Sequence, residues 1–216
     1  MLAAGAALAQ PHAALEAAGW HHAEWHGIHP ARWRPLPGGG VAVEGHAQGS
    51  FVWRRAPPGP PGCLAWRWRV EEGPPPMDLT RRGDDRALSI AVGFTGWPPG
   101  VTVWQRTQHA IAQGHAGGHV LPRSILIYTW GGTGREPPFF PSPYAAGLGK
   151  VRILRPADAP RGRWLEERVD LAADWRAAFG GGAVPPLQEI AIGTDADDSR
   201  SRVVAAVEGI RFVPCR

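Results

Sequence analysis

The 216-residue chain is short of lysine, cysteine and long apolar runs, and each shortage narrows what the protein can be. Lys150 is the only lysine, and the arginines are scattered instead of forming a basic tract, so the net charge of +4 does not indicate a nucleic-acid partner. No apolar run approaches the ~20 residues that span a bilayer, so we expect no transmembrane segment. The sequence contains no P-loop, no dinucleotide fingerprint and no Gly-x-Ser-x-Gly elbow, so none of these common motifs indicates an enzyme class.

The two cysteines, Cys63 and Cys215, lack a histidine partner in ligand spacing and therefore do not predict a structural zinc site. Two interpretations stay open. They form a disulfide of an exported protein if their strands are neighbours, or they are buried thiols that behave as small hydrophobic residues.

The first 19 residues resemble the end of a secretory signal, because a run of small apolar residues precedes an A-x-A cleavage pattern at Ala7-Leu8-Ala9. The basic segment of a signal peptide is missing, so the alternative is an alanine-rich helix or a disordered leader. We expect a leader over residues 1–19 and a single domain over residues 20–216. The expected location is periplasmic or secreted, and otherwise cytoplasmic.

What the chain has in abundance is glycine and proline, with 29 and 23 residues and no Gly-X-Y period. This punctuation is typical of many short strands joined by tight turns. Residues 64–70 alternate apolar and polar, which predicts a half-buried strand, and the apolar run at 125–130 predicts a strand buried on both faces. We therefore predict an all-β fold: a two-sheet antiparallel sandwich, jelly-roll-like.

Two helical segments interrupt the strands. The stretch 170–179 predicts one short helix, with Asp170 as its cap and Gly180 at its end. The stretch 104–115 predicts a short helix or a lid-like insertion. Histidines in and after this insertion are interpreted as solvated surface residues: His109, His115 and His119.

Two acidic turns, each next to an apolar strand, are the strongest candidates for a site. They contain Asp84, Asp85, Asp195, Asp197 and Asp198. Carboxylates at strand ends suit a structural Ca²⁺, although the spacing is not that of an EF-hand. The alternative is turn chemistry, in which the side chains bond local amides or arginines. Because both turns flank strands of one sandwich, we expect Asp84 or Asp85 to lie within about 10 Å of Asp195.

Eleven tryptophans supply the second candidate signal, because flat aromatic rings stack on sugars. Residues in or beside the long loops are the candidate ligand-binding platform: Trp97, Trp104, Trp130 and Tyr144. Alternation with aliphatic residues places three others in the predicted core: Trp66, Trp68 and Trp164.

The order of several motifs resembles the bacterial domain-of-unknown-function family 3047 over roughly residues 20–213. They are RRGDDRALSIAVGF, ILIYTWGG, DWRAAFG and IAIGTDADDS. The resemblance implies an exported β-sandwich similar to carbohydrate-binding modules, and it implies no known reaction.

These observations favour a non-catalytic exported protein that binds carbohydrate or another cell-envelope ligand through loop aromatics. No residue is assigned a catalytic role, and the only candidate cofactor is a structural Ca²⁺. One alternative is a hydrolase or lyase acting on polysaccharide through the clustered aspartates. Another is a structural or interaction protein without a small ligand.

Overall fold

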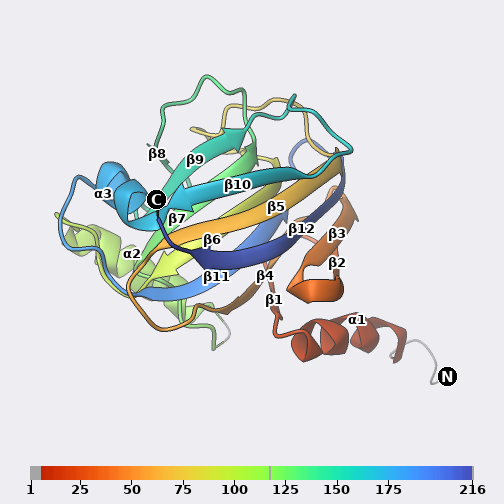
Figure 1. Ribbon diagram of the computed structural model, residues 1–216, viewed down its shortest axis with the longest axis horizontal. Coiled ribbons are helices and arrows are strands. Elements are labelled where there is room, and N and C mark those ends of the chain that lie inside the picture. Colours follow the sequence, from red (N-terminus) through yellow and green to blue (C-terminus); the bar gives the residue numbers. More distant parts are fainter. Residues whose placement is uncertain (1–5, 117, 216) are drawn as a thin grey trace.

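Short strands separated by glycine and proline turns form two stacked sheets, as the sequence predicts (Figure 1). This computed structural model describes residues 6–116 and 118–215. The seven-stranded sheet has the order β1 (His21–Glu24), β4 (Ser50–Arg55), β11 (Leu187–Asp195), β6 (Arg86–Phe94), β7 (Ser124–Gly131), β9 (Gly149–Arg155) and β8 (Phe140–Pro141). The five-stranded sheet has the order β10 (Leu165–Asp170), β5 (Cys63–Glu72), β12 (Arg202–Val213), β3 (Val41–His46) and β2 (Arg32–Pro35).

One strand pair departs from the predicted antiparallel arrangement. β9 pairs with β7 in parallel, with Ile125 opposite Gly149. The chain leaves β7 at Gly131 and returns through residues 132–148 to the level at which β7 began, so β9 runs in the same direction as β7.

The core lies between the sheets and follows the predicted alternation in β5. Its inward-facing residues are Leu64, Trp66, Trp68 and Val70, each at most 1% exposed. β7 was expected to be buried on both faces, and this is correct for the inner face and for Thr129 on the outer face, which is 0% exposed. Leu126 and Tyr128 face the core, whereas Ile125 and Ile127 are partly exposed on the outer face.

Both predicted helical segments are helices. α3 (Leu171–Phe179) begins where the Asp170 carboxylate accepts a hydrogen bond from the amide of Ala173 at 2.9 Å. It ends at Gly180, whose φ of 84° is the left-handed conformation that glycine tolerates best. α2 (Val103–Gly114) is capped at its start by Thr102, which forms a capping box with Gln105. None of the residues of α2 is buried.

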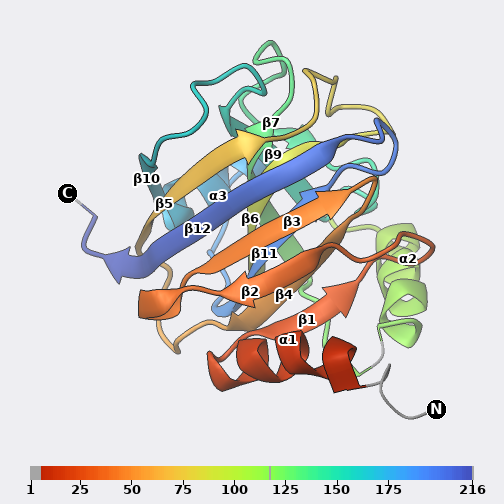
Figure 2. The ribbon, with the colours of Figure 1, turned by 90° about the vertical axis from the view of Figure 1, so that its right-hand side faces the viewer.

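α1 (Ala6–Ala17) covers part of the predicted leader and lies beside β1 and β2 (Figure 2). Leu15 is 1% exposed and belongs to the core, so this end of the segment packs onto the sandwich. A signal peptide stays a prediction, and residues 1–5 lie outside the described chain. A short 3₁₀ helix, η1 (Pro37–Gly39), leads into β3. No helix in the described part of the chain is long and apolar enough to cross a membrane.

The two cysteines form a disulfide. Val213 of β12 lies opposite Cys63 of β5, and this register brings Cys215 near enough for a bond, with a Cα–Cα distance of 5.1 Å. The disulfide therefore ties the end of the chain to the five-stranded sheet.

Candidate functional site

A cavity of about 700 Å³ lies over the outer face of the seven-stranded sheet. Ile125 and Ile127 of β7 form part of its floor, since they point away from the core. The walls come from α2, from the segment between β1 and β2, and from the loop between β8 and β9. Aliphatic and aromatic side chains dominate these walls: Trp25, Ile28, Ile111, Leu121 and Leu148.

α2 closes one side of the cavity without entering the core. Because none of its residues is buried, α2 is held in place by polar contacts of its side chains. Gln105 donates a hydrogen bond to the carbonyl of Ala146 at 2.9 Å, and a ring nitrogen of His109 contacts the carbonyl of Pro122 at 3.0 Å. Gln108 and Ile111 on the same helix line the cavity. Of the two predicted forms of this stretch, the structure shows the short helix, and it forms one wall of the cavity.

The two acidic turns meet at one end of this cavity. β6 begins where β11 ends, because the strands are antiparallel neighbours with Arg86 opposite Asp195. Carboxylate oxygens of Asp85, Asp195 and Asp197 lie within 4.8 Å of one another. The predicted convergence is confirmed for Asp85. A bound Ca²⁺ stays a prediction.

The carboxylates of this group are poorly satisfied by the protein. Asp85 is 1% exposed, and its Oδ2 accepts a hydrogen bond from the amide of Ser199 at 2.7 Å. Oδ1 of Asp85 and Oδ1 of Asp195 are buried with no hydrogen-bond partner among the described residues. Burial raises the pKa of Asp195 to about 8, assisted by the hydrogen bond to Asp197 and opposed by the charge of Arg86.

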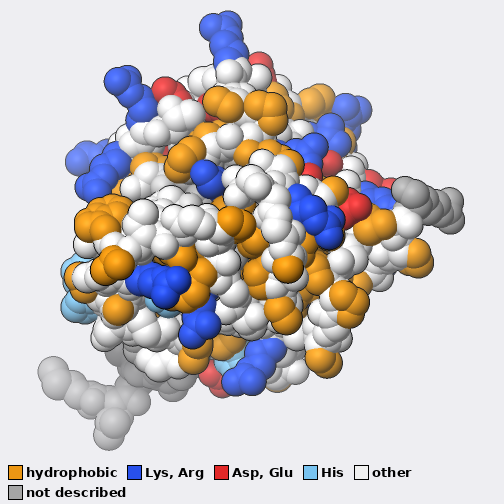
Figure 3. Space-filling model, turned by 90° about the vertical axis from the view of Figure 1, so that its left-hand side faces the viewer, with side chains coloured by type: hydrophobic (Ala, Val, Ile, Leu, Met, Phe, Trp, Pro, Cys, Tyr) orange, Lys and Arg blue, Asp and Glu red, His pale blue; other side chains and the backbone are white. Residues whose placement is uncertain are grey.

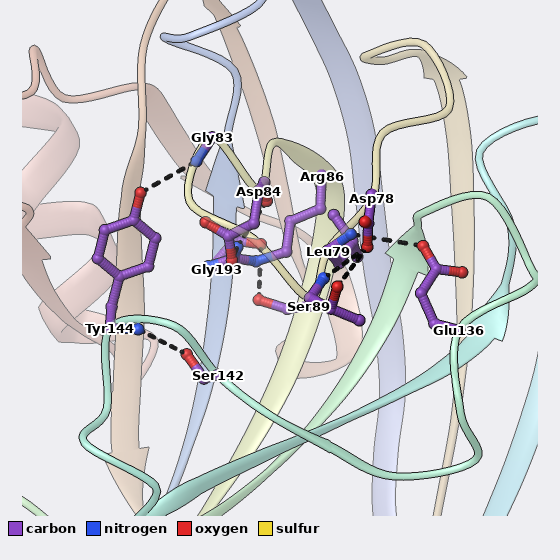
Figure 4. Close-up of polar contacts among 11 residues, drawn as sticks. Asp78, Leu79, Gly83, Asp84, Arg86, Ser89, Glu136, Ser142, Tyr144 and Gly193 are labelled. Atoms are coloured by element: carbon purple, nitrogen blue, oxygen red, sulfur yellow. Dashed lines mark hydrogen bonds and ion pairs between the residues drawn. The ribbon is translucent and has the colours of Figure 1, made fainter.

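Asp84 plays a different part from its neighbour. Nη1 of Arg86 donates to Oδ2 of Asp84 at 2.6 Å and to the Asp84 carbonyl at 2.8 Å (Figure 4). Burial raises the pKa of Asp84, and the Arg86 charge opposes the rise. Asp84 is thus the counterion of Arg86, which is the turn chemistry that the sequence left open. Asp198 lines the cavity beside Asp197, outside the group of three.

The structure separates the four candidate aromatic residues. Tyr144 lines the cavity, is 58% exposed, and accepts a hydrogen bond through its hydroxyl from the amide of Gly83 at 3.2 Å (Figure 4). Trp104 on α2 is 61% exposed. It lies one turn before Gln108, on the same side of the helix. Figure 3 looks onto the side of the molecule that carries α2 and α3, where hydrophobic side chains lie among basic ones.

The other two candidates do not form part of an exposed platform. Trp130 is 1% exposed and packs edge-on against Trp68 with ring centroids 5.6 Å apart. Its assignment to a ligand surface is wrong, because it shares the core-facing side of β7 with Tyr128, two residues earlier. Trp97 is partly buried against His109, with Arg106 over its ring.

Two further expectations about single residues are wrong. Trp164 is partly exposed and lies under Arg67 and Arg69 on the outer face of the five-stranded sheet, not in the core. His119 is largely buried: its ring stacks on Trp53 with centroids 4.2 Å apart, and Nε2 lies 2.7 Å from Oε2 of Glu189. These contacts join residues far apart in the sequence, so no local pattern could have found them.

Comparison with known proteins agrees with the resemblance seen in the motifs. A search among curated proteins finds no match to the chain. The family model described as "Protein of unknown function (DUF3047)" matches residues 19–211, a range that covers the site and both sheets except the last two residues of β12. The chain belongs to family DUF3047.

Proposed function

We propose that the protein is a non-catalytic, exported β-sandwich that binds a glycan or another cell-envelope ligand in the cavity over the seven-stranded sheet. The observation that carries the proposal is the cavity itself, about 700 Å³, with largely apolar walls and carboxylates at one end. Small-molecule sites are concave, of this size, and combine apolar walls with a few polar groups that orient the ligand.

The chemistry of the walls supports a hydroxyl-rich ligand with apolar faces. Trp25 and Tyr144 line the cavity and offer aromatic rings to flat C–H faces. The indole Nε1 of Trp25 is buried without a hydrogen-bond partner among the described residues. Asp197 and Asp198 offer acceptors for ligand hydroxyls at the acidic end.

The disulfide between Cys63 and Cys215 supports export, because such bonds persist mainly in oxidising compartments. Fractionation of the native host, with the redox state of both cysteines measured in each fraction, tests this part separately. A cytoplasmic protein with reduced thiols would contradict it.

Variants of the exposed aromatic residues test ligand binding. Trp104→Ala and Tyr144→Phe are assayed for retention on polysaccharide columns, for binding on a glycan array and for melting temperature. Trp164→Ala is the matched control, since it removes a partly exposed tryptophan from the opposite sheet.

We expect the two cavity-side variants to weaken binding while the melting temperature changes little, because exposed side chains contribute little to stability. The control should bind as the wild type does. Equal binding by all variants would contradict the proposal. Release of new reducing ends or unsaturated products from the glycans would replace it with the hydrolase or lyase alternative.

A further inference from the structure

We propose that Asp85, Asp195 and Asp197 form a binding site for a hard divalent cation of the Ca²⁺ class at the acidic end of the cavity. The site does not depend on what the cavity binds. It is narrower than the set of five aspartates that the sequence singles out, because Asp84 neutralises Arg86 and Asp198 lies outside the group.

The buried carboxylate of Asp85 is the observation that points to a cation. Asp85 is 1% exposed, and its Oδ1 has no hydrogen-bond partner among the described residues. A buried acceptor without a partner lowers the stability of the folded protein, because it has lost its hydrogen bonds to water. Oδ1 of Asp195 is in the same condition. A buried charge is ordinarily paired or bound to a metal, and the described residues supply no partner for these oxygens.

The geometry fits one ion. Ca²⁺ binds oxygen at about 2.3–2.6 Å, so two ligands on opposite sides of the ion are roughly 5 Å apart. The oxygens of all three carboxylates lie within 4.8 Å of one another, inside that limit. All three donors are oxygens, which suits Ca²⁺ or Mg²⁺ and disfavours zinc, for which histidine and cysteine are the usual ligands.

The neighbouring positive charges do not replace the cation. Arg86 lines the cavity close to the group, but its Nη1 is paired with Asp84, and no hydrogen bond or ion pair joins it to Asp85, Asp195 or Asp197 among the described residues. The lysine, Lys150, lies over the ring of Phe179. Asp195 and Asp197 line the cavity, so an ion between them would keep positions open to water or ligand. If the proposed glycan function is correct, that ion would bind vicinal hydroxyls or a carboxylate of the ligand.

The test is a calorimetric titration of the full chain, freed of metal with chelator, with CaCl₂ and separately with MgCl₂ at constant ionic strength. We expect one ion per chain and a melting temperature that rises with ion concentration by several degrees, because the ion binds the folded form. Asp195→Asn and Asp197→Asn should each weaken binding at least tenfold. Asp78→Asn, which removes an exposed carboxylate bonded only to Thr80, should bind as the wild type does.

Near-UV circular dichroism establishes that each variant is folded, and Asp197→Asn serves if Asp195→Asn does not fold. No heat and no shift in melting temperature for the folded wild type up to ~10 mM of either ion would overturn the proposal, since even weak calcium sites bind below that concentration. Binding by both variants as tight as that of the wild type would overturn it as well. No glycan is present, so a failed glycan experiment leaves this result unaffected.

Discussion

The outer faces of the two sheets carry hollows of similar volume that differ in how their carboxylates are paired. A hollow of about 690 Å³ lies on the five-stranded sheet, close in volume to the cavity on the other face. One ion pair in this hollow crosses strands, with Nε of Arg67 in β5 donating to Glu208 in β12 at 2.6 Å. Arg168 and Arg211 donate to the backbone carbonyls of Pro214 and Gly209. The carboxylate of Glu208 is therefore neutralised from a neighbouring strand, and the three arginines each already have an acceptor.

On the seven-stranded sheet, carboxylates face other carboxylates. Asp85 and Asp195 each have a buried oxygen without a partner, and Asp197 lies beside them. Volume alone therefore does not distinguish the two faces. What distinguishes them is that the Glu208 carboxylate is paired with an arginine, whereas Asp85 and Asp195 keep buried oxygens without a partner, which is the condition that a ligand or an ion can relieve.

The largest expected effect comes from the five-stranded side. Replacing both Cys63 and Cys215 by alanine should lower the free energy of unfolding by roughly 2–5 kcal/mol, because the disulfide closes a long loop in the unfolded chain. Chemical denaturation measures it, with the oxidised wild type as reference. Ion binding by the folded variant should be unchanged, because the bond lies away from the aspartates. An unchanged denaturation midpoint would show that the bond adds no stability.

A smaller change, of opposite sign, is expected on the seven-stranded side. In chelator, Asp195→Asn should raise the free energy of unfolding by about 1–3 kcal/mol, because it removes a poorly satisfied carboxylate from a crowded acidic group. Thermal and chemical unfolding measure it. A less stable variant in chelator would mean that the Asp195 carboxylate stabilises the fold by itself, and the contrast between the two faces would fail.

The corresponding substitution on the five-stranded sheet should be weakly destabilising. Glu208→Gln breaks the ion pair with Arg67 and should cost at most about 1 kcal/mol, since both groups are partly exposed to solvent. The loss should shrink at high salt, where exposed pairs are screened. If Glu208→Gln instead raised the free energy of unfolding, as we expect for Asp195→Asn, the two faces would not differ in this respect.

The smallest effect is a pH dependence at the edge strand β1. Burial lowers the pKa of His22, the nearby His12 lowers it further, and Glu24 opposes both. The unfolded chain therefore binds this proton more readily than the folded one, so stability should fall as the pH drops below about 6.5 and level off below the folded pKa.

His22→Gln should lose part of the fall in melting temperature between neutral pH and mildly acidic pH. His46→Gln, which changes an exposed histidine of β3, is the control and should keep the wild-type profile. Identical profiles for all three proteins would exclude His22 as the source.

Local features of the sequence determined the elements of the fold. Alternation at Leu64–Val70 predicted a core strand, and it is one because side chains of period two separate a buried face from a wet one. Asp170 and Gly180 predicted the ends of α3, since capping involves residues only a few positions apart. The family motifs and the sandwich class could also be predicted, because they too depend on local patterns that recur along the chain.

Only the tertiary structure decided which of these features form a site. In the sequence, Trp130 and Trp104 both lie in or beside long loops. Trp130 faces the core side of β7 and is buried, whereas Trp104 lies on α2 and is exposed. Asp85 and Asp195 meet because β6 and β11 are neighbours in the sheet, and Asp84 is removed from the group by Arg86. Burial, pairing and unsatisfied acceptors depend on what the rest of the chain brings alongside a residue, and that contact is made only on folding.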